Sequence, residues 1–297
     1  MNTNGNTYTV VYSTVIVVLV AAILATVAMA LKPKQDANIK AETICQMLAA
    51  AQYSSMDELM ESGNENVLVK YQENIKEAYT VNLDGQKVRD LSIDPIELAD
   101  NLKAQNDNMK KGKADKVELP VYVFSKEGGD ITVVPVYGAG LWGPVWGYVA
   151  LESDLRTIAG AYFDHSGETP GLGAKIKDDP AFRAKFTGKK IDLSAEKPFE
   201  IVKGADRDNQ VDAITGATMT SKGLSEGIAK WLVGYKAYLA AGAQDCCLKE
   251  SAECCGGESC GKSGECCGDC EGGCQDGNCQ ENCAGQCREV EPTNVEE

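Results

Sequence analysis

The segment just before the last predicted helix combines hydroxyl groups, small residues and one carboxylate. It reads DAITGATMT, from Asp212 to Thr220. Exposed N–H groups and the positive end of the helix macrodipole favour a phosphate at such a position. Gly216 and Ala217 leave room for a bulky ligand close to the backbone. A phosphate could accept hydrogen bonds from the threonine hydroxyls here, or be esterified to one of them: Thr215, Thr218 and Thr220.

The competing interpretation of this segment is ordinary helix capping. Thr220 and Ser221 are residue types that commonly accept a hydrogen bond from an N–H group in the first turn of a helix. A helix is expected from Ser221 to about Ala241 and would need its first N–H groups satisfied. The residue types alone favour capping over phosphate binding, so a phosphate site needs support from elsewhere in the chain.

Two glycine-rich segments are further candidates for a ligand site. GAGLWGPVWGY occupies residues 138–148, and HSGETPGLG occupies residues 165–173. The first contains GxGxxG, the pattern of a dinucleotide-binding turn, but that pattern must open a helix, whereas Pro144 and a strand-like run follow here. A dinucleotide site is therefore excluded. The second segment could also be a Gly/Pro-rich turn, and Trp142 an ordinary core aromatic residue.

Neither His165 nor Cys45 is assigned a catalytic role. His165 is the only histidine in the chain and could be a structural residue or a proton donor near a ligand; we favour the structural role. Cys45 lies on a predicted amphipathic helix, Asp36–Ala51, where a thiol is expected to pack in the core. We expect no catalytic residues and no metal ligands in the body of the chain.

The N-terminal region contains a membrane anchor. Residues 10–31 carry no charge and span roughly 33 Å as a helix, enough for a bilayer core. The segment Ala28–Ala30 resembles a signal-peptide cleavage site, but the apolar run is longer than a signal core and no basic residue precedes it, so we expect a retained anchor. The positive-inside bias would place the C-terminal part in the cytoplasm, because the nearest lysines all follow the helix: Lys32, Lys34 and Lys40.

The rest of the body predicts an α+β fold, with mainly antiparallel strands and segregated helices. A hairpin is expected around Asp84-Gly85, with a type I′ turn. The last helix places an apolar stripe toward the core: Leu224, Ile228, Trp231, Leu232, Tyr235 and Leu239. The other expected helices are 95–109 and about 180–186, and the other strands are 120–124, 131–137, 145–151, 157–163 and 199–203.

The C-terminal segment, 243–297, differs in composition from the body. It carries 13 acidic and 3 basic residues, which is −10 of the net charge of −15, and 12 of the 13 cysteines. No basic patch is present for nucleic acid. No apolar core can form in this segment, so order would require disulfides or metal. Six disulfides, a zinc or iron–sulfur site using the CxxC of Cys267 and Cys270, and a disordered tail all remain open.

The three candidate segments together resemble a known family. Asp-x-x-(Ser/Thr)-Gly-Ala-Thr, from Asp212 to Thr218, resembles the motif read by the FMN transferase, which takes FMN from FAD and esterifies the final threonine. The two glycine-rich segments look like hallmarks of the C subunit of the sodium-translocating NADH:quinone reductase and of its relative, the G subunit of Rnf-type complexes. The resemblance implies covalent FMN on Thr218, with the flavin also lined by Trp142, Glu168, Thr169, Leu172 and Gly173.

The resemblance also implies a function and a place in the cell. The chain would carry electrons, through FMN, within a multisubunit translocase that passes electrons from NADH to ubiquinone and exports sodium. It would not bind NADH itself. We expect a single-pass protein of the inner membrane with the FMN domain on the periplasmic side, against the charge bias. The expected parts are a transmembrane helix (10–31), a membrane-proximal helical and hairpin region (32–118), an FMN-binding domain (119–242) and an acidic Cys-rich tail (243–297).

Three other functions remain open at this point. The G subunit of an Rnf-type ion-translocating complex uses the same motif, although the length before residue 119 and the Gly-Leu-Trp block favour the quinone reductase. A membrane-anchored FMN-dependent reductase would act alone on a small molecule. A metal-binding or structural surface protein would contain the flavin motif by chance. The Cys-rich tail departs from the family pattern, and no role is assigned to it.

Overall fold

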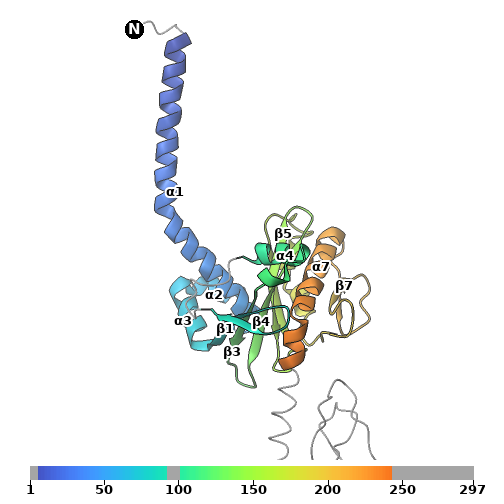
Figure 1. Ribbon diagram of the computed structural model, residues 1–297. Helices are drawn as coiled ribbons and strands as arrows, with labels where there is room; N and C mark the ends of the chain where they lie inside the picture. The colour runs from blue at the N-terminus through green and yellow to red at the C-terminus, as the bar shows by residue number, and fades with distance from the viewer. Residues whose placement is uncertain (1–5, 92–100, 243–297) are drawn as a thin grey trace, which may run out of the picture.

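The computed structural model describes residues 6–91 and 101–242. The Cys-rich segment predicted at 243–297 lies outside these residues. A long N-terminal helix, α1 (Asn6–Ala50), extends away from a domain built on one antiparallel sheet (Figure 1). The predicted α+β class is confirmed.

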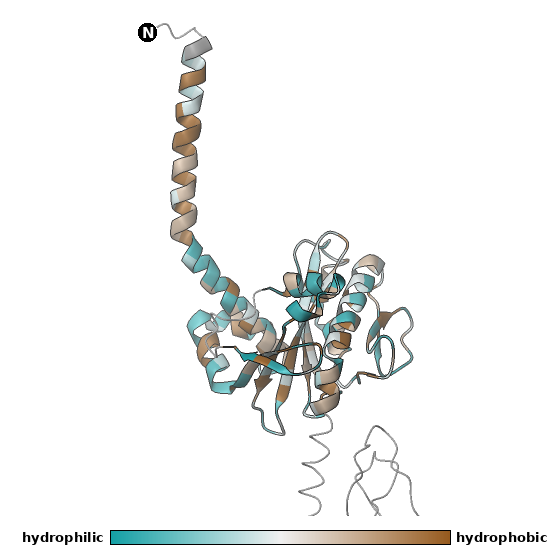
Figure 2. Ribbon diagram, viewed as in Figure 1, coloured by the Kyte–Doolittle hydropathy of each residue, from teal (hydrophilic) through white to brown (hydrophobic). Residues whose placement is uncertain are grey.

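Helix α1 joins the apolar N-terminal run to the domain, and Pro33 lies inside it. Its first part is long and apolar enough to cross a membrane and is exposed to the surroundings, and Figure 2 shows the change from apolar to polar residues along the helix. From Ala41 onward it packs in the domain and buries Ile44, Cys45, Met47 and Leu48. The predicted segment Asp36–Ala51 is therefore the continuation of the anchor helix, and Cys45 is a core residue as expected.

The sheet has six strands in the order β2-β1-β3-β4-β5-β6, and each neighbouring pair is antiparallel. Alternating residues point to opposite faces, so each strand contributes to two cores. Val133 on β4 packs toward α1, whereas Val134 and Val136 belong to the cluster under the last helix. The strands are β1 (Ile75–Val81), β2 (Lys87–Asp90), β3 (Leu119–Phe124), β4 (Ile131–Ala139), β5 (Pro144–Leu151) and β6 (Ile158–His165).

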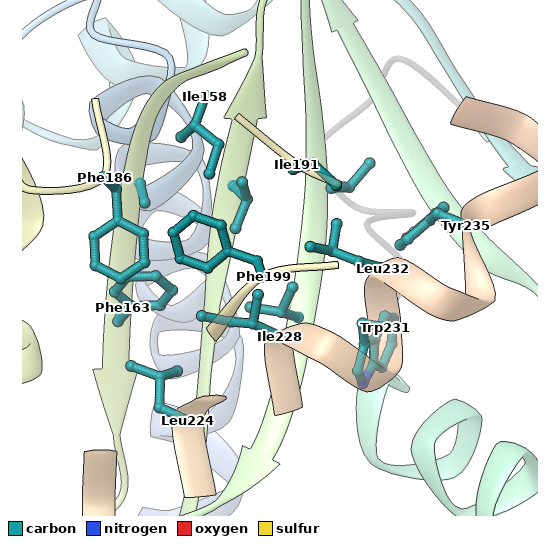
Figure 3. Packing of buried hydrophobic residues seen from close by; sticks show 14 of the residues in the cluster. Ile158, Phe163, Phe186, Ile191, Phe199, Leu224, Ile228, Trp231, Leu232 and Tyr235 are labelled. Carbon is teal, nitrogen blue, oxygen red and sulfur yellow. The ribbon is translucent and has the colours of Figure 1, made fainter. Parts of the chain in front are cut away.

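One face of the sheet is covered by the inner part of α1 with α2 (Met56–Ser62) and α3 (Asn64–Asn74). Helix α2 begins with a capping box formed by Ser55 and Glu58, which defines its first residue. The other face is covered by the last helix, α7 (Thr218–Gly234), and by the segments around Phe186 and Phe199 (Figure 3). The predicted apolar stripe from Leu224 to Leu239 is buried throughout, although α7 itself ends at Gly234 and not near Ala241.

Backbone contact between α7 and β4 is unusually close. A Cβ atom added at Gly223 would lie 1.8 Å from the carbonyl oxygen of Ala139, and one added at Gly227 would lie 2.9 Å from Gly138 Cα. Only glycine permits this approach, because any side chain would overlap the strand. The helix is thereby seated directly on the end of β4, next to the turn that leads into β5.

Among the smaller elements, helices α2 and α3 were not predicted, and the β1–β2 turn differs from its prediction. The hairpin of β1 and β2 forms, but its turn is not type I′, because Gly85 alone of the two central residues has a positive φ (78°) and Asn82 Oδ1 accepts the N–H groups of Asp84 and Gln86. Helix α4 begins at Leu102, and residues 95–100 of the predicted helix lie outside the described part. The short strands β7 (Glu200–Val202) and β8 (Gln210–Asp212) pair in parallel, which was not predicted.

The remaining elements are short and connect these parts. A 3₁₀ turn, η2, follows α4 (Leu102–Lys110) at Ala114–Lys116. Helix α5 (Lys175–Asp178) follows the predicted 165–173 segment, and α6 (Pro180–Ala184) confirms the predicted short helix. Asp179 caps α6 through the N–H of Ala181, with proline at the first helical position.

Candidate functional site

The three segments singled out in the sequence meet in space at one end of the sheet. The 140–143 turn joins β4 to β5, the 166–173 loop follows β6, and the 213–217 segment leads into α7. A Cβ atom at Gly140 would meet the carboxylate of Glu168, and one at Gly216 would meet Leu172 Cδ2 at 3.0 Å. In Figure 1 the start of α7 lies at the end of the domain toward which α1 extends.

The GxGxxG pattern at 138–143 belongs to a β-hairpin. The N–H of Gly140 donates to the carbonyl oxygen of Gly143 at 2.8 Å, which closes the turn between β4 and β5. No helix follows, so the exclusion of a dinucleotide-binding turn is confirmed. The turn leaves Leu141 and Trp142 exposed, and Trp142 has 70% of its surface accessible. Trp142 is therefore not a core aromatic residue.

Thr218 is the first residue of α7, and its side chain is exposed. The helix begins three residues earlier than predicted. Its N-cap is Ala217, which provides no side-chain hydrogen bond, and there is no acidic residue in the first turn. The positive end of the helix is therefore left for another anion, with a hydroxyl beside it.

The helix-capping interpretation of Thr220 and Ser221 is wrong. Thr220 Oγ1 donates a hydrogen bond to Glu168 Oε2 at 2.6 Å, and Ser221 Oγ accepts one from the N–H of Ile214 at 3.1 Å. Both side chains are buried, because they face the domain and not the helix end. This distinction could not be read from residue types, since it depends on where α7 starts.

The backbone before α7 requires glycine at one position. Gly216 has φ of 83°, in the left-handed region, where a side chain is strained. Thr215 beside it is exposed, and Ala217 is buried. The small residues of the motif thus shape the chain so that Thr218 is presented at the surface.

Asp212 has a structural role of its own. Its Oδ1 accepts hydrogen bonds from the N–H groups of Ala205 (3.1 Å) and Gly204 (3.0 Å), which hold the pKa of the carboxyl below its usual value. The carboxylate closes the loop between β7 and β8 and remains exposed. Its described hydrogen bonds go to this loop and not to Thr218.

Glu168 lies at the centre of the converging segments, and only 5% of its surface is exposed. Its Oε1 accepts a hydrogen bond from the N–H of Trp142 at 2.9 Å, and its Oε2 accepts the one from Thr220. A Cβ atom at Gly173 would lie 2.5 Å from Oε2. Glu168 thus connects the turn, its own loop and the first turn of α7.

The loop around Glu168 is held from both sides. The N–H of Glu168 donates to His165 Nδ1 at 3.1 Å, which agrees with the structural role favoured for this histidine. The carbonyl oxygen of Thr169 accepts the N–H groups of Leu172 and Ala174, so the loop closes as a turn. Thr169 and Leu172 remain exposed at its rim.

A buried polar cluster connects this loop to α1. Asp164 Oδ2 accepts hydrogen bonds from Gln46 Nε2 on α1 and Lys177 Nζ on α5, both at 2.8 Å. Burial opposes the charged form of Lys177, but the hydrogen bond and charge of Asp164 outweigh it, so the pKa of Lys177 is raised. The sequence carried no sign of this cluster, because its members lie on three different elements.

Two exposed apolar residues at the site were missed in the sequence, Leu141 and Met219. Leu141 precedes Trp142 and Met219 follows Thr218, and this position beside a predicted site residue was the only sequence signal that they belong to the site. With Trp142 and Leu172 they form an apolar rim drawn from all three segments.

The arrangement fits a phosphate ester with a large planar group. An uncapped helix start offers N–H groups and a hydroxyl at Thr218, and Gly216 keeps the backbone approach open. The apolar rim next to it would cover a ring system. A dinucleotide fits less well, because no second phosphate-binding turn is present among the described residues.

The chain is similar to proteins of known name. A family model described as the FMN-binding domain matches residues 140–233. The C subunit of the Na(+)-translocating NADH-quinone reductase of Pseudomonas aeruginosa is 33% identical over 259 residues, which cover 80% of this chain and 97% of that protein. Its counterpart in Vibrio anguillarum is 31% identical over 230 residues, covering 73% of this chain and 88% of that protein.

Solved structures lead to the same family. The crystal structure of the C subunit from Parabacteroides distasonis is 37% identical with a TM-score of 0.59, covering 70% of this chain and 96% of that chain. Shewanella oneidensis NqrC is 27% identical with a TM-score of 0.54, covering 67% of this chain and 95% of that one. Since the sequence, the FMN-binding domain and the fold all agree, the chain belongs to the NqrC family, the C subunits of the Na(+)-translocating NADH-quinone reductase.

Proposed function

We propose that this protein carries electrons through FMN joined to Thr218 by a phosphoester. The observation that carries the proposal is the exposed hydroxyl of Thr218 at the first, uncapped residue of α7, beside the apolar rim. A helix start without a side-chain cap favours the phosphate, and the rim favours the ring. The family motif from Asp212 to Thr218 supports the same residue.

The attachment is a group transfer without oxidation. Thr218 Oγ1 attacks the phosphorus on the FMN side of FAD and loses its proton. The bond between that phosphorus and the bridging oxygen breaks, and AMP leaves. An FMN transferase would catalyse the step, reading the segment from Asp212 to Thr218. The exposure of this segment leaves it accessible to another protein before the flavin is in place.

The remaining residues would hold the flavin by contact. Thr215, Gly216 and Ala217 would shape the backbone at the phosphate, and Trp142 and Leu172 of the apolar rim would contact the ring together with Thr169. Gly173 lies beneath them, buried against Glu168. FMN supplies reversible electron uptake and release when bound. The chain's own groups fix its place and keep it from leaving between turnovers.

The proposed location is the inner membrane, with α1 as a single-pass anchor and the domain on the periplasmic side. The apolar run of α1 supports the anchor, and the family resemblance supports the side. Long domains cross membranes largely regardless of flanking lysines, so the charge bias after the helix does not oppose it strongly. The other subunits of the reductase would donate and accept the electrons.

The test is fluorescence of the denatured protein on a gel after coexpression with an FMN transferase. Denaturation removes flavin that is not covalently bound. We expect a fluorescent band for the wild type, a dark band for Thr218→Ala, and a fluorescent band for Thr187→Ala, which removes an exposed hydroxyl outside the site. The mass of the peptide containing Thr218 should increase by one FMN less one water. A fluorescent Thr218→Ala band would place the attachment elsewhere.

A further inference from the structure

The carboxylate of Glu168 is the point where the three segments of the site are joined. It accepts one hydrogen bond from the main chain of the β4–β5 turn, at Trp142, and one from the first turn of α7, at Thr220. Gly140 and Gly173 leave space for it, because a Cβ atom at either position would lie within 2.5 Å of one of its oxygens. The backbone around the carboxylate is therefore shaped to contain it.

A buried carboxylate without a cationic partner is an unfavourable way to stabilise a fold, and within the described part of the chain Glu168 is such a carboxylate. Among the described residues, no lysine, arginine or histidine forms an ion pair with it. A buried carboxylate loses its hydration, and two hydrogen bonds from neutral donors compensate only in part. Neutral side chains would hold the same segments together at lower cost. Buried polar groups of this kind are expected where a site must be held in one geometry.

We propose that Glu168 is a positioning residue that fixes the exposed ring of Trp142 relative to the attachment point on α7. This inference rests on the proposed attachment of FMN to Thr218. Thr220 and Thr218 lie in the same helical turn, so the hydrogen bond of Thr220 sets the place of Thr218. The hydrogen bond from the Trp142 N–H sets the turn that carries the indole ring.

A positioning residue is needed because a phosphoester fixes only the phosphate end of FMN. The chain between the phosphate and the ring system has many rotatable bonds, so the ring stays free unless protein groups at fixed positions enclose it. The apolar rim can enclose it only if the turn and the helix keep their spacing. Glu168 is the residue that contacts both, and its own N–H is held by His165 Nδ1.

Four variants separate geometry from charge. Glu168→Gln keeps an acceptor for the Trp142 N–H and a group that can bond the Thr220 hydroxyl, but removes the charge. Glu168→Ala removes both hydrogen bonds, and Thr220→Val removes one with little change of shape. Glu226→Ala is the control for loss of a carboxylate, because Glu226 is exposed on α7, the helix that carries Thr220.

The first measurement is visible circular dichroism of the covalently attached flavin in the purified full chain, per flavin bound. A ring held in one orientation gives a strong signal, and a loosely held ring does not. We expect Glu168→Ala to lose roughly half or more of this signal, because the ring is no longer held in one place. Thr220→Val should change it in the same direction, and Glu168→Gln and Glu226→Ala should retain it.

The second measurement is hydrogen exchange in the chain without flavin, which does not depend on the attachment. The Trp142 amide should exchange about tenfold faster in Glu168→Ala, because it loses its acceptor. Cooperative thermal unfolding shows that each variant is folded. A folded Glu168→Ala that is dark on the gel beside a fluorescent wild type also supports the proposal. In that case Thr218 is no longer held in the position in which it is modified.

Two results would overturn the inference. One is an unchanged flavin signal and unchanged Trp142 exchange in Glu168→Ala. The other is a Glu168→Gln variant as impaired as Glu168→Ala, which would assign the effect to charge. A dark wild-type band would instead refute the proposed attachment, and the exchange of the Trp142 amide would still decide whether Glu168 holds the turn.

Discussion

Asp212 combines a structural role with a proposed recognition role. Its carboxylate holds the β7–β8 loop through two backbone N–H groups, and its folded-state pKa is below the ordinary 3.8 for that reason. A depressed pKa means that the stabilisation is present above the unfolded-state pKa and is lost as the pH falls through the folded-state pKa. The structural role depends on an acceptor oxygen at neutral pH, whereas recognition by a transferase could depend on the charge.

The variant Asp212→Asn separates these two roles. Its amide oxygen can still accept from Gly204 and Ala205 but lacks the charge, so we expect its thermal unfolding midpoint at pH 7 to lie slightly below that of the wild type. We expect its covalent flavin, read from gel fluorescence, to be largely lost because the carboxylate charge is absent. Its acid unfolding should depend less on pH near 4 than that of the wild type. A folded Asp212→Asn with full flavin would show that the FMN transferase does not recognise the charge of Asp212.

Individual residues of the site differed in how well the sequence predicted them. Thr218, Gly216 and Leu172 were located by motif, and the structure brings their segments together. The hydrogen bonds of Thr220, Ser221 and Asp212 were not predictable, since each depends on a partner distant in the chain or on the helix start. Short motifs indicate which segments meet, but not which atoms pair.

At the scale of elements, the contact of α7 with β4 decides where the site lies. The helix can approach the strand because Gly223 and Gly227 face Gly138 and Ala139 without side chains. The hydrophobic period of α7 predicted its buried stripe, because apolar side chains repeat at helical spacing. The glycine contact was not predicted, since it has no apolar pattern and appears only when the two elements are packed.

Gly223→Ala tests this contact. The added methyl group would overlap the Ala139 carbonyl, which belongs to the backbone of β4 and cannot move alone. We expect the free energy of unfolding to fall by about 3 kcal/mol, more than the ~1 kcal/mol that alanine gains over glycine in a helix. Thermal unfolding of the detergent-solubilised chain, followed by near-ultraviolet circular dichroism, measures it.

Gly234→Ala is the matched control on the same helix. Its new methyl group would meet side-chain atoms of Leu119, Met109 and Leu83, at 3.1, 3.2 and 3.7 Å, and flexible side chains can yield. This variant should unfold within about 1 kcal/mol of the wild type. Equal loss of unfolding free energy in both variants would show that the close approach of α7 to β4 does not cause the destabilisation by Gly223→Ala.

At the scale of the whole molecule, the sequence predicted the class and the order of the parts well. The anchor, the antiparallel strands and the final helix follow from local periodicity, which a sequence displays directly. The parallel pair of β7 and β8 and the cluster of Asp164, Gln46 and Lys177 do not, because they join distant segments of irregular pattern. The side of the membrane is the one large-scale property on which charge bias and family resemblance disagree.

A reporter fusion resolves the orientation. Alkaline phosphatase needs disulfides and is active only when exported, so we expect activity when it is fused after residue 242 and expressed in a bacterial host. A fluorescent reporter that folds only in the cytoplasm, fused at the same residue, should stay dark. The reverse pattern would follow the lysines after the anchor and place the domain in the cytoplasm.

Helix α1 continues from the apolar run into the domain, with Pro33 inside it and a bend between its outer and inner parts (Figure 1). Nine residues, 32–40, lie between Leu31, the end of the apolar run, and Ala41, the first residue buried in the domain. As a helix this arm spans about 15 Å, and Pro33 within it removes one backbone hydrogen bond. Each residue of that arm contributes about 1.5 Å of height and about 100° of rotation. An insertion or deletion in this arm would therefore change both the distance of the domain from the apolar run and the direction in which the 140–143 turn and the start of α7 face.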